Sequence, residues 1–244
     1  MNKLYAVIDG ATIDDLEQIL KEKDAHYGLI PPEPIDEAIR EYLPYLVECN
    51  DDIKVWLTGL DVRWGVYFSG NVSFVAARKH FRSLLKIKID GHVNYFRFYE
   101  PESLDAMWSR LTDWQKRSFV GVFDEVISQD NTAYTVTKAE HYAPMLQLSQ
   151  DDILFISQSR SEKIKSFITN KISALGIDCD IGDIQQILDY LMLIGLMNQD
   201  LMYEVCRYIF EHDLKKRDKY KMIFSPRDNE TATYRAESVL MGLC

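Results

Sequence analysis

The stretch that decides the fold reads WGVYFSG at 64–70, NVSFVAARKHFRSLL at 71–85 and KIKIDGHVNYFRFYEP at 86–101. It predicts a strand, a basic helix and a hairpin that a proline closes. Asp90-Gly91 stands between two alternating runs, which is a strong signal for a two-residue hairpin turn. We therefore expect Ile89 to face His92 and Ile87 to face Asn94.

The two faces of the predicted hairpin differ in chemistry. One face carries the apolar side chains Leu85, Ile87, Phe96 and Phe98. The other carries Lys86, Lys88, Tyr95, Arg97 and Tyr99. Arg97 then lies in a strand between two tyrosines, where a guanidinium is expected to stack on a ring and pair with a carboxylate. Candidate partners are Asp9, Glu48 and Glu100, and this structural role is favoured over ligand binding.

Composition narrows the class of protein. The chain has 244 residues, a net charge of -10 and 47% hydrophobic residues, which is ordinary for a globular protein with a real core. The negative charge argues against a general nucleic-acid partner. No run is long enough for a membrane span and the start of the chain lacks a secretory pattern, so we expect a cytoplasmic protein.

The cysteines give no sign of a metal or redox site. Cys49, Cys179, Cys206 and Cys244 form no CxxC pair and have no histidine at zinc-ligand spacing. We expect them to be packing residues or free thiols. No cofactor and no metal is predicted.

Before the hairpin, short apolar runs predict two strands. Residues 4–8 form the first, and Asp9 at its end is interpreted as a turn residue in preference to a ligand. Thr12 is expected to cap a helix that follows. Residues 24–41, with three prolines, are expected to be a connecting loop, and residues 42–49 a second strand.

The pattern changes near Ser149. Helical periodicity of 3.6 residues predicts segments at about 149–175, 181–197 and 199–216. The sequence thus predicts an α/β fold class. An N-terminal α/β lobe at 1–147 has a mixed sheet with flanking helices, and an all-helical lobe follows at 148–244. The last 20 residues are expected to be disordered alone or to fold against a partner.

No catalytic motif accompanies these elements. The chain has no phosphate-binding loop, no GxGxxG, no HExxH and no GxSxG, so no catalytic residue is predicted. His80 stands between Arg78 and Arg82 and is expected to be half-buried or solvated in preference to binding an anion. The basic helix face of Arg78, Lys79 and Arg82 has two interpretations, a partner-binding patch or a solvated face with salt bridges; the second is favoured.

The C-terminal helices offer further partner-binding candidates. Their apolar stripes include Met192, Met197, Met202 and Tyr208. Such stripes more often form a core, but methionines also suit adaptable recognition grooves.

Several segments together resemble one family. They are YAVIDGA (5–11), PYLVE (44–48), WGVYFSG (64–70), ARKHFRSLLKI (77–87), YFRFYEP (95–101) and Gln115 to Phe119. In this order they resemble the type VI secretion effector-adaptor proteins, also called effector chaperones or Tap and Tec proteins. That family has aspartate before the proline of its FRFYDP segment, where this chain has Glu100. The resemblance covers roughly residues 4–125, and the segment 77–101 is its most specific part.

The resemblance implies a non-enzymatic adaptor. Such proteins bind a toxic effector, here expected through its N-terminal segment, and load it onto the VgrG spike. Asp9, Trp64, Arg97, Tyr99 and Glu100 would then form a structural motif. Two alternatives stay open: a regulatory module that binds an anionic ligand through Arg78, Arg82 and Arg97, and a hydrolase that uses His80 or His92 with an acid.

Overall fold

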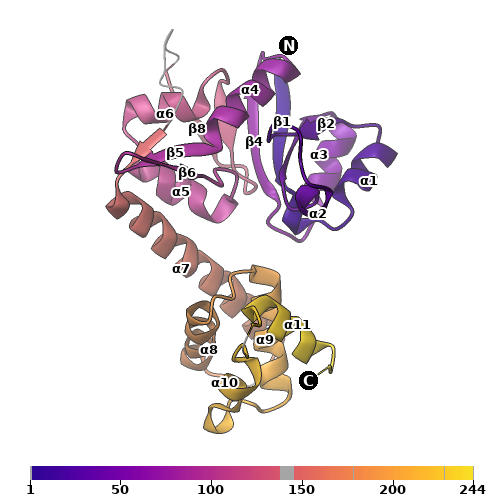
Figure 1. The fold of residues 1–244 in the computed structure, drawn as a ribbon, viewed down its shortest axis with the longest axis vertical. Coiled ribbons are helices and arrows are strands. Elements are labelled where there is room, and N and C mark those ends of the chain that lie inside the picture. The colour runs from indigo at the N-terminus through magenta and orange to yellow at the C-terminus, as the bar shows by residue number, and fades with distance from the viewer. Residues whose placement is uncertain (1, 138–145, 178, 228, 244) are drawn as a thin grey trace. The chain divides into compact units, whose positions relative to one another are not determined.

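The computed structural model describes residues 2–137, 146–177, 179–227 and 229–243 (Figure 1). By its internal contacts the chain divides into two units, Met1–Ser159 and Arg160–Cys244. The first contains both sheets and the second only helices, which confirms the predicted fold class. The division falls inside helix α7 (Gln150–Ala174). The boundary between residues 147 and 148 that the sequence suggested stays a prediction.

The larger sheet has six strands in the order β2-β3-β1-β4-β7-β8. These strands are β2 (His26–Leu29), β3 (Pro44–Cys49), β1 (Lys3–Asp9), β4 (Gly65–Gly70), β7 (Glu125–Ile127) and β8 (Ala133–Thr135). Every neighbouring pair in it is antiparallel. Strand β1 lies between β3 and β4 in the middle of this sheet, so both of its edges are hydrogen-bonded.

The smaller sheet is mixed. Its order is β6-β5-β9, with β6 (His92–Tyr95), β5 (Lys86–Ile89) and β9 (Leu146–Leu148). Strands β5 and β6 form the predicted hairpin, with Ile89 opposite His92 and Ile87 opposite Asn94. Strand β9 pairs with β5 in parallel, which a chain segment distant in sequence can supply but a hairpin cannot.

Hydrophobic clusters cover both faces of the larger sheet. Tyr5 and Val7 face one cluster and Ala6 and Ile8 the other, as the alternation along a strand requires. Helix α4 (Phe74–Leu84) contributes to the first cluster. Helices α1 (Leu16–Glu22) and α3 (Asp51–Thr58) contribute to the second. Trp64 is buried in the second cluster, where its indole N–H donates to the Leu57 carbonyl at 3.1 Å.

Polar side chains cap several of the helix starts. Asn50 caps α3, Ser73 caps α4, and Thr112 with Gln115 forms a capping box on α6 (Asp113–Val120). Helix α5 (Pro101–Arg110) begins at the proline that ends the hairpin segment. The prediction for Thr12 is wrong: Asp9 caps a short 3-10 turn at Gly10–Thr12, and α1 begins only after Asp15.

The segment 24–41 is not simply a loop. It contains the edge strand β2 and helix α2 (Glu37–Arg40). Strand β2 has four residues and is mostly half-exposed, so it lacks a long apolar run. Helix α2 buries no residue, so it has no apolar stripe from which it could be predicted.

The second unit packs part of α7 with α8 (Ile181–Leu193), α9 (Gln199–Glu211), α10 (Lys219–Phe224) and α11 (Ala232–Leu240) around its own core. The expectation of a disordered tail is wrong over α11. Thr231 caps that helix, which buries Ala236 and Val239. Arg235 also donates to the Ile223 carbonyl at 2.7 Å. Small side chains at helical spacing give little hydropathy signal, which is why the sequence did not indicate this helix.

A membrane-spanning helix would need a long apolar stretch. Within the described parts of the chain, no helix combines the length and the apolar character that a crossing requires.

Gly65 allows β1 and β4 to approach closely. A Cβ added there would lie 1.9 Å from the Val7 carbonyl oxygen, a backbone atom of the central strand. We predict that Gly65→Ala lowers the free energy of unfolding by at least about 2 kcal/mol, because the backbone must shift to relieve the overlap. Urea unfolding measures it.

The control is Gly59→Ala, whose added Cβ would make only ordinary contact, 3.5 Å from the Trp56 carbonyl oxygen. It should stay within about 0.5 kcal/mol of the wild type. Equal losses in the two variants would contradict the prediction.

Candidate functional site

The sequence predicted that Arg97 lies within a strand, and this is wrong. Arg97 lies just after the hairpin, beyond the end of β6. Strand β6 ends at Tyr95, and the Glu100 N–H donates to the Arg97 carbonyl at 3.3 Å to form a turn. The turn gives the guanidinium two carboxylate partners. Its Nε lies 2.7 Å from Glu100 Oε1, and its Nη2 contacts Asp9 Oδ2. Two of the three predicted partners are thus confirmed.

The third predicted partner, Glu48, is used elsewhere. It pairs with Lys3 at 2.6 Å and with His26 at 3.2 Å. Glu48 belongs to β3, whose partners are β1 and β2. Its carboxylate therefore ties the edge of the larger sheet together.

Asp9 combines two roles at the end of β1. Its carboxylate accepts from the Ala11 N–H at 3.3 Å, which shapes the turn that the sequence predicted, and it also pairs with Arg97. The Asp9 side chain is 8% exposed and that of Arg97 43%. Burial by itself lowers the pKa of the Arg97 guanidinium, but Asp9 and Glu100 outweigh it and the pKa lies above its ordinary value.

Tyr99 adds an aromatic wall to this cluster. Its ring is buried, and the Arg97 guanidinium carbon lies 5.6 Å from the ring centroid. Burial raises the pKa of its hydroxyl, which lies 3.5 Å from the Tyr95 hydroxyl. Asp9, Arg97, Tyr99 and Glu100 form what we call the Arg97 cluster. The Trp64 side chain belongs to the core on the second face of the sheet, and its carbonyl accepts from the Asp9 N–H at 2.8 Å, so Trp64 contacts the cluster through its backbone.

Arg78 and Arg82 each have a backbone partner within the fold, and partner binding by this helix face stays a prediction. Arg78 Nε donates to the Leu29 carbonyl at 2.6 Å, and Arg82 Nε to the Ile30 carbonyl at 2.8 Å. The two side chains therefore hold the end of β2 against α4. Burial lowers the pKa of Arg78, and neighbouring Arg82 adds to the effect. Lys79, between them in sequence, is exposed.

His80 is buried, so the expectation of a half-buried or solvated side chain is wrong. Its Nε2 lies 2.9 Å from the Phe119 carbonyl, which can only accept, so this nitrogen carries the proton. Burial lowers the pKa of His80 to about 4. The ring is packed in the core beside Phe81 and Phe123, and His92 is exposed on the hairpin. The structure therefore does not bring these two histidines together.

The candidates in the second unit have different environments. Met202 is fully buried, and Met192 and Tyr208 are partly buried against the core. Met197 is 37% exposed. The most exposed apolar side chains of this unit are Leu193, at the end of α8, and Met222 on α10.

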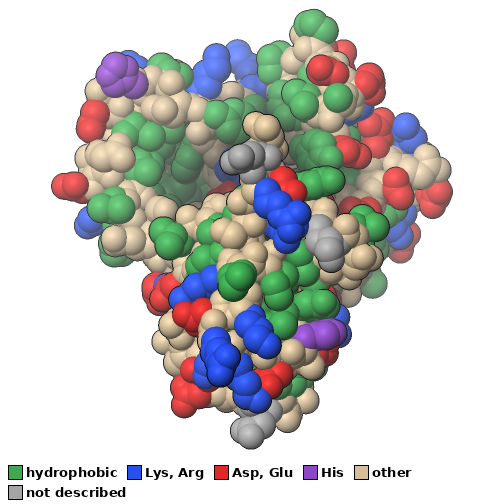
Figure 2. Space-filling model, turned by 60° about the horizontal axis from the view of Figure 1, so that its bottom comes forward, with side chains coloured by type: hydrophobic (Ala, Val, Ile, Leu, Met, Phe, Trp, Pro, Cys, Tyr) green, Lys and Arg blue, Asp and Glu red, His purple; other side chains and the backbone are tan. Residues whose placement is uncertain are grey.

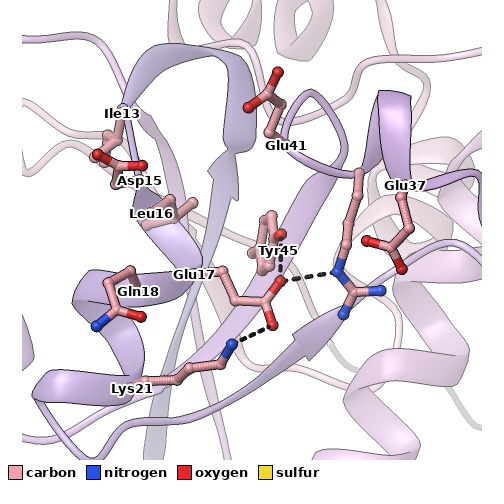
Figure 3. Close-up of a pocket in the computed structure, with 10 residues that line it drawn as sticks. Ile13, Asp15, Leu16, Glu17, Gln18, Lys21, Glu37, Glu41 and Tyr45 are labelled. Carbon is pink, nitrogen blue, oxygen red and sulfur yellow. Dashed lines mark hydrogen bonds and ion pairs between the residues drawn. The ribbon is translucent and has the colours of Figure 1, made fainter.

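A pocket of about 290 Å³ in the first unit centres on Glu17 (Figure 3). Arg40 Nε donates to its Oε2 at 2.8 Å and Tyr45 Oη to the same oxygen at 3.3 Å, while Lys21 Nζ lies 3.1 Å from Oε1. The hydrogen bond from Arg40 and the ion pair with Lys21 lower the pKa of Glu17 to about 2. This carboxylate joins α1, α2 and β3 and remains ionised at neutral pH.

Sequence reasoning missed this network. Glu17 and Lys21 have the spacing of a helical ion pair, which was the available signal. Arg40 lies in the segment 24–41, which the sequence predicted to be a loop. No pattern in the sequence therefore indicated that Arg40 contacts Glu17.

The basic cluster after α9 is matched by acids. Lys215 pairs with Asp183, Lys216 with Asp213, and Lys221 with Asp218. Acidic and basic side chains lie next to one another on the face drawn in Figure 2. A strongly basic surface of the kind that nucleic-acid binding requires is therefore not formed by these lysines.

Metal and thiol chemistry have little support in the described ranges. There, no group of three or more His, Cys, Asp or Glu residues is arranged to hold a metal ion. Within the same ranges Cys49, Cys179 and Cys206 form no disulfide, and Cys244 lies outside the described residues.

Comparison with known families gives one match. Residues 4–118 match the family model of the domain of unknown function DUF4123. The DUF4123 match includes the whole Arg97 cluster, Trp64, Arg78 and Arg82, and it ends inside α6. Neither the curated proteins nor the solved structures gave a match to the chain.

We predict that Arg97→Met lowers the free energy of unfolding by about 1–3 kcal/mol, because the buried Asp9 carboxylate loses its guanidinium. A double-mutant cycle with Asp9→Asn, measured by urea unfolding, isolates the coupling between the two side chains. The coupling should exceed about 0.5 kcal/mol.

Arg207→Met is the matched control, since Arg207 pairs with Glu204 on the surface of one helix. Its cost should stay below about 1 kcal/mol. Independent, additive effects of Asp9→Asn and Arg97→Met would contradict the proposed pairing.

The pKa of Glu17 predicts a pH dependence. A carboxyl group whose pKa falls from 4.5 to about 2 on folding stabilises the folded state above pH 4.5, and this stability is lost as pH falls toward 2. The wild type should therefore exceed Glu17→Gln in stability at pH 6, and the difference should shrink by pH 3. Urea unfolding across this range measures it.

Glu162→Gln provides the control, because Glu162 is 72% exposed on α7 and its pair with Lys165 is expected to contribute little. A Glu17→Gln difference that stays constant from pH 6 to pH 3 would refute the assignment.

Proposed function

We propose that this protein is a non-enzymatic cytoplasmic adaptor of type VI secretion. It binds a toxic effector, through the effector's N-terminal segment, and loads it onto the VgrG spike protein. The proposal assigns no catalytic residue and no cofactor. Its two partners are proteins, and nucleic acid and membrane are not among them.

The observation that carries the proposal is where the family match lies. Residues 4–118 match DUF4123, and this range contains the segments that resemble the effector-adaptor proteins, up to Gln115. The Arg97 cluster supports the same assignment physically. It joins the YAVIDGA segment at Asp9 to the YFRFYEP segment at Arg97 and Glu100, so segments distant in sequence act as one framework.

An adaptor also needs surfaces that partners can cover. Both units present apolar side chains that are more than half exposed: Val55, Val75, Val93 and Tyr95 in the first, and Ile181, Leu193, Met222 and Met241 in the second. Burial of such side chains is a principal source of affinity between proteins. Green hydrophobic side chains among charged ones are visible in Figure 2. We assign effector binding to the helical unit, because it lies outside the family match and is free to differ with the cargo.

The test is co-purification of the full chain with a VgrG protein and a type VI toxin from the same organism. The wild type should bring down both. The double variant Leu193→Glu/Met222→Glu should bind the toxin at least about tenfold more weakly, because each charge would be buried against the partner. Both side chains are 83% exposed, so folding should be unaffected.

Val55→Glu, at a residue that is 74% exposed in the first unit, is the matched control and should retain toxin binding. Failure of the full chain to capture either protein at micromolar concentration would overturn the proposed function. Equal toxin binding by the double variant would overturn the assignment to the helical unit.

A further inference from the structure

Strand β6 presents an open edge of the smaller sheet. The Phe96 N–H donates to the Leu85 carbonyl at 2.9 Å, so these two residues are a hydrogen-bonded pair of the hairpin. Hydrogen-bonded pairs alternate along an antiparallel ladder. Asn94 and His92 therefore direct their backbone groups to β5, while Val93 and Tyr95 direct theirs away from the sheet.

Nothing in the described part of the first unit covers this edge. All four residues of β6 are exposed, with Val93 at 55% and Tyr95 at 57%. Two other edge strands, β9 and β2, have backbone carbonyls that side chains of this chain occupy. The Gln115 side chain donates to the Gln147 carbonyl on β9, and Arg78 and Arg82 occupy carbonyls at the end of β2.

The open edge is only four residues long, but it lacks proline, a Lys, Arg, Asp or Glu side chain and a bulge. Natural edge strands carry proline, charged side chains or a bulge, which prevent pairing with other chains. The two residues of β6 whose backbone N–H and C=O groups point away from the sheet are Val93 and Tyr95. Valine and tyrosine both favour strand pairing. The hairpin register continues without a bulge from Ile89 opposite His92 to Lys86 opposite Tyr95.

The face next to this edge is basic. Lys86 lies opposite Tyr95 and Lys88 opposite Val93, so the two lysines share one sheet face with the exposed valine and tyrosine. Among the described residues neither lysine has an ion-pair partner, although the whole chain has a net charge of -10. An acidic strand is therefore a better electrostatic fit here than a neutral or basic one.

We propose that β6 binds an extended acidic segment of a partner protein as an added strand. Backbone groups of Val93 and Tyr95 would hydrogen-bond to the segment, as in other cases of strand addition. Acidic side chains at alternate positions would lie about two strand spacings, roughly 10 Å, from the backbone of β5. The flexible stems of Lys86 and Lys88 reach toward them across β6. The assignment of this partner as effector or spike rests on the proposed function; the strand addition does not.

The experiment uses the full-length protein and a short synthetic peptide that alternates glutamate with valine. A peptide with lysine in place of glutamate is the matched control. We expect saturable binding of the acidic peptide in fluorescence anisotropy, at least about tenfold tighter than binding of the basic one. Equal binding of the two peptides, or no binding of the acidic one, would overturn the proposal.

Amide hydrogen exchange followed by NMR locates the added strand. Exchange of the Val93 and Tyr95 amides should slow about tenfold or more when the acidic peptide saturates the protein, and that of Asn94, already bonded to β5, should change less. Protection at other sites with no change at Val93 and Tyr95 would overturn the proposal.

Variants separate backbone pairing from charge. Val93→Pro removes an outward N–H without removing a bond to β5, so it should abolish binding, and Val93→Thr should retain it. Lys88→Glu should weaken binding about tenfold. Lys54→Glu makes the same change of charge at an exposed position of α3 and should leave binding unchanged. Circular dichroism checks that each variant is folded.

Three further outcomes are informative. If a second copy of the chain pairs at β6, light scattering would give twice the mass of 28.4 kDa and the same amides would be protected without peptide, which would overturn the proposed occupant. Peptide binding without capture of toxin or VgrG would leave the strand addition standing and refute the proposed function. If Val93→Pro captures toxin and VgrG with wild-type affinity, neither protein binds at β6. That result would overturn the assignment of the added strand to either of them.

Discussion

The contact between Asp9 and Arg97 is the interaction on which the first unit depends. Asp9 ends β1, the central strand, which pairs with β3 on one side and β4 on the other. A carboxylate that is 8% exposed requires a charged partner, and the hairpin exit supplies it. Because Arg97 also binds Glu100 directly before α5, one guanidinium fixes the larger sheet, the hairpin and the start of a helix relative to one another.

How far the sequence predicted this structure depends on the range of the interactions. The hairpin register and the three long helical segments from residue 149 onward follow from local rules, and the structure confirms them. The pairing of Arg97 with Asp9 was among the predicted possibilities because an arginine beside a core face needs a carboxylate. Its strand position was wrong, since a turn at 97–100 cannot be distinguished by alternation from a continuing strand.

The misses share a physical cause. Arg78 and Arg82 bind backbone carbonyls, and every residue carries a carbonyl, so no side chain elsewhere in the sequence indicates the partner. Strand β2 and helix α11 are short and are stabilised by what they pack against more than by their own pattern. Glu17 pairs with Arg40 because the fold brings α1 and α2 close together, and no local pattern predicts that contact.

The use of arginine within the fold changes what remains for partners. The guanidinium groups of Arg78, Arg82 and Arg97 each hold backbone or carboxylate groups of this chain, so the basic residues that drew attention in the sequence are largely structural. A lysine, by contrast, has a flexible stem and a well-hydrated ammonium, so it stays on a surface at little cost. Lys86 and Lys88 therefore keep their charges available beside the open edge of β6. A framework held by arginines that leaves β6 and Lys86 exposed, and Lys88 partly exposed, is consistent with a protein that acts by holding another chain.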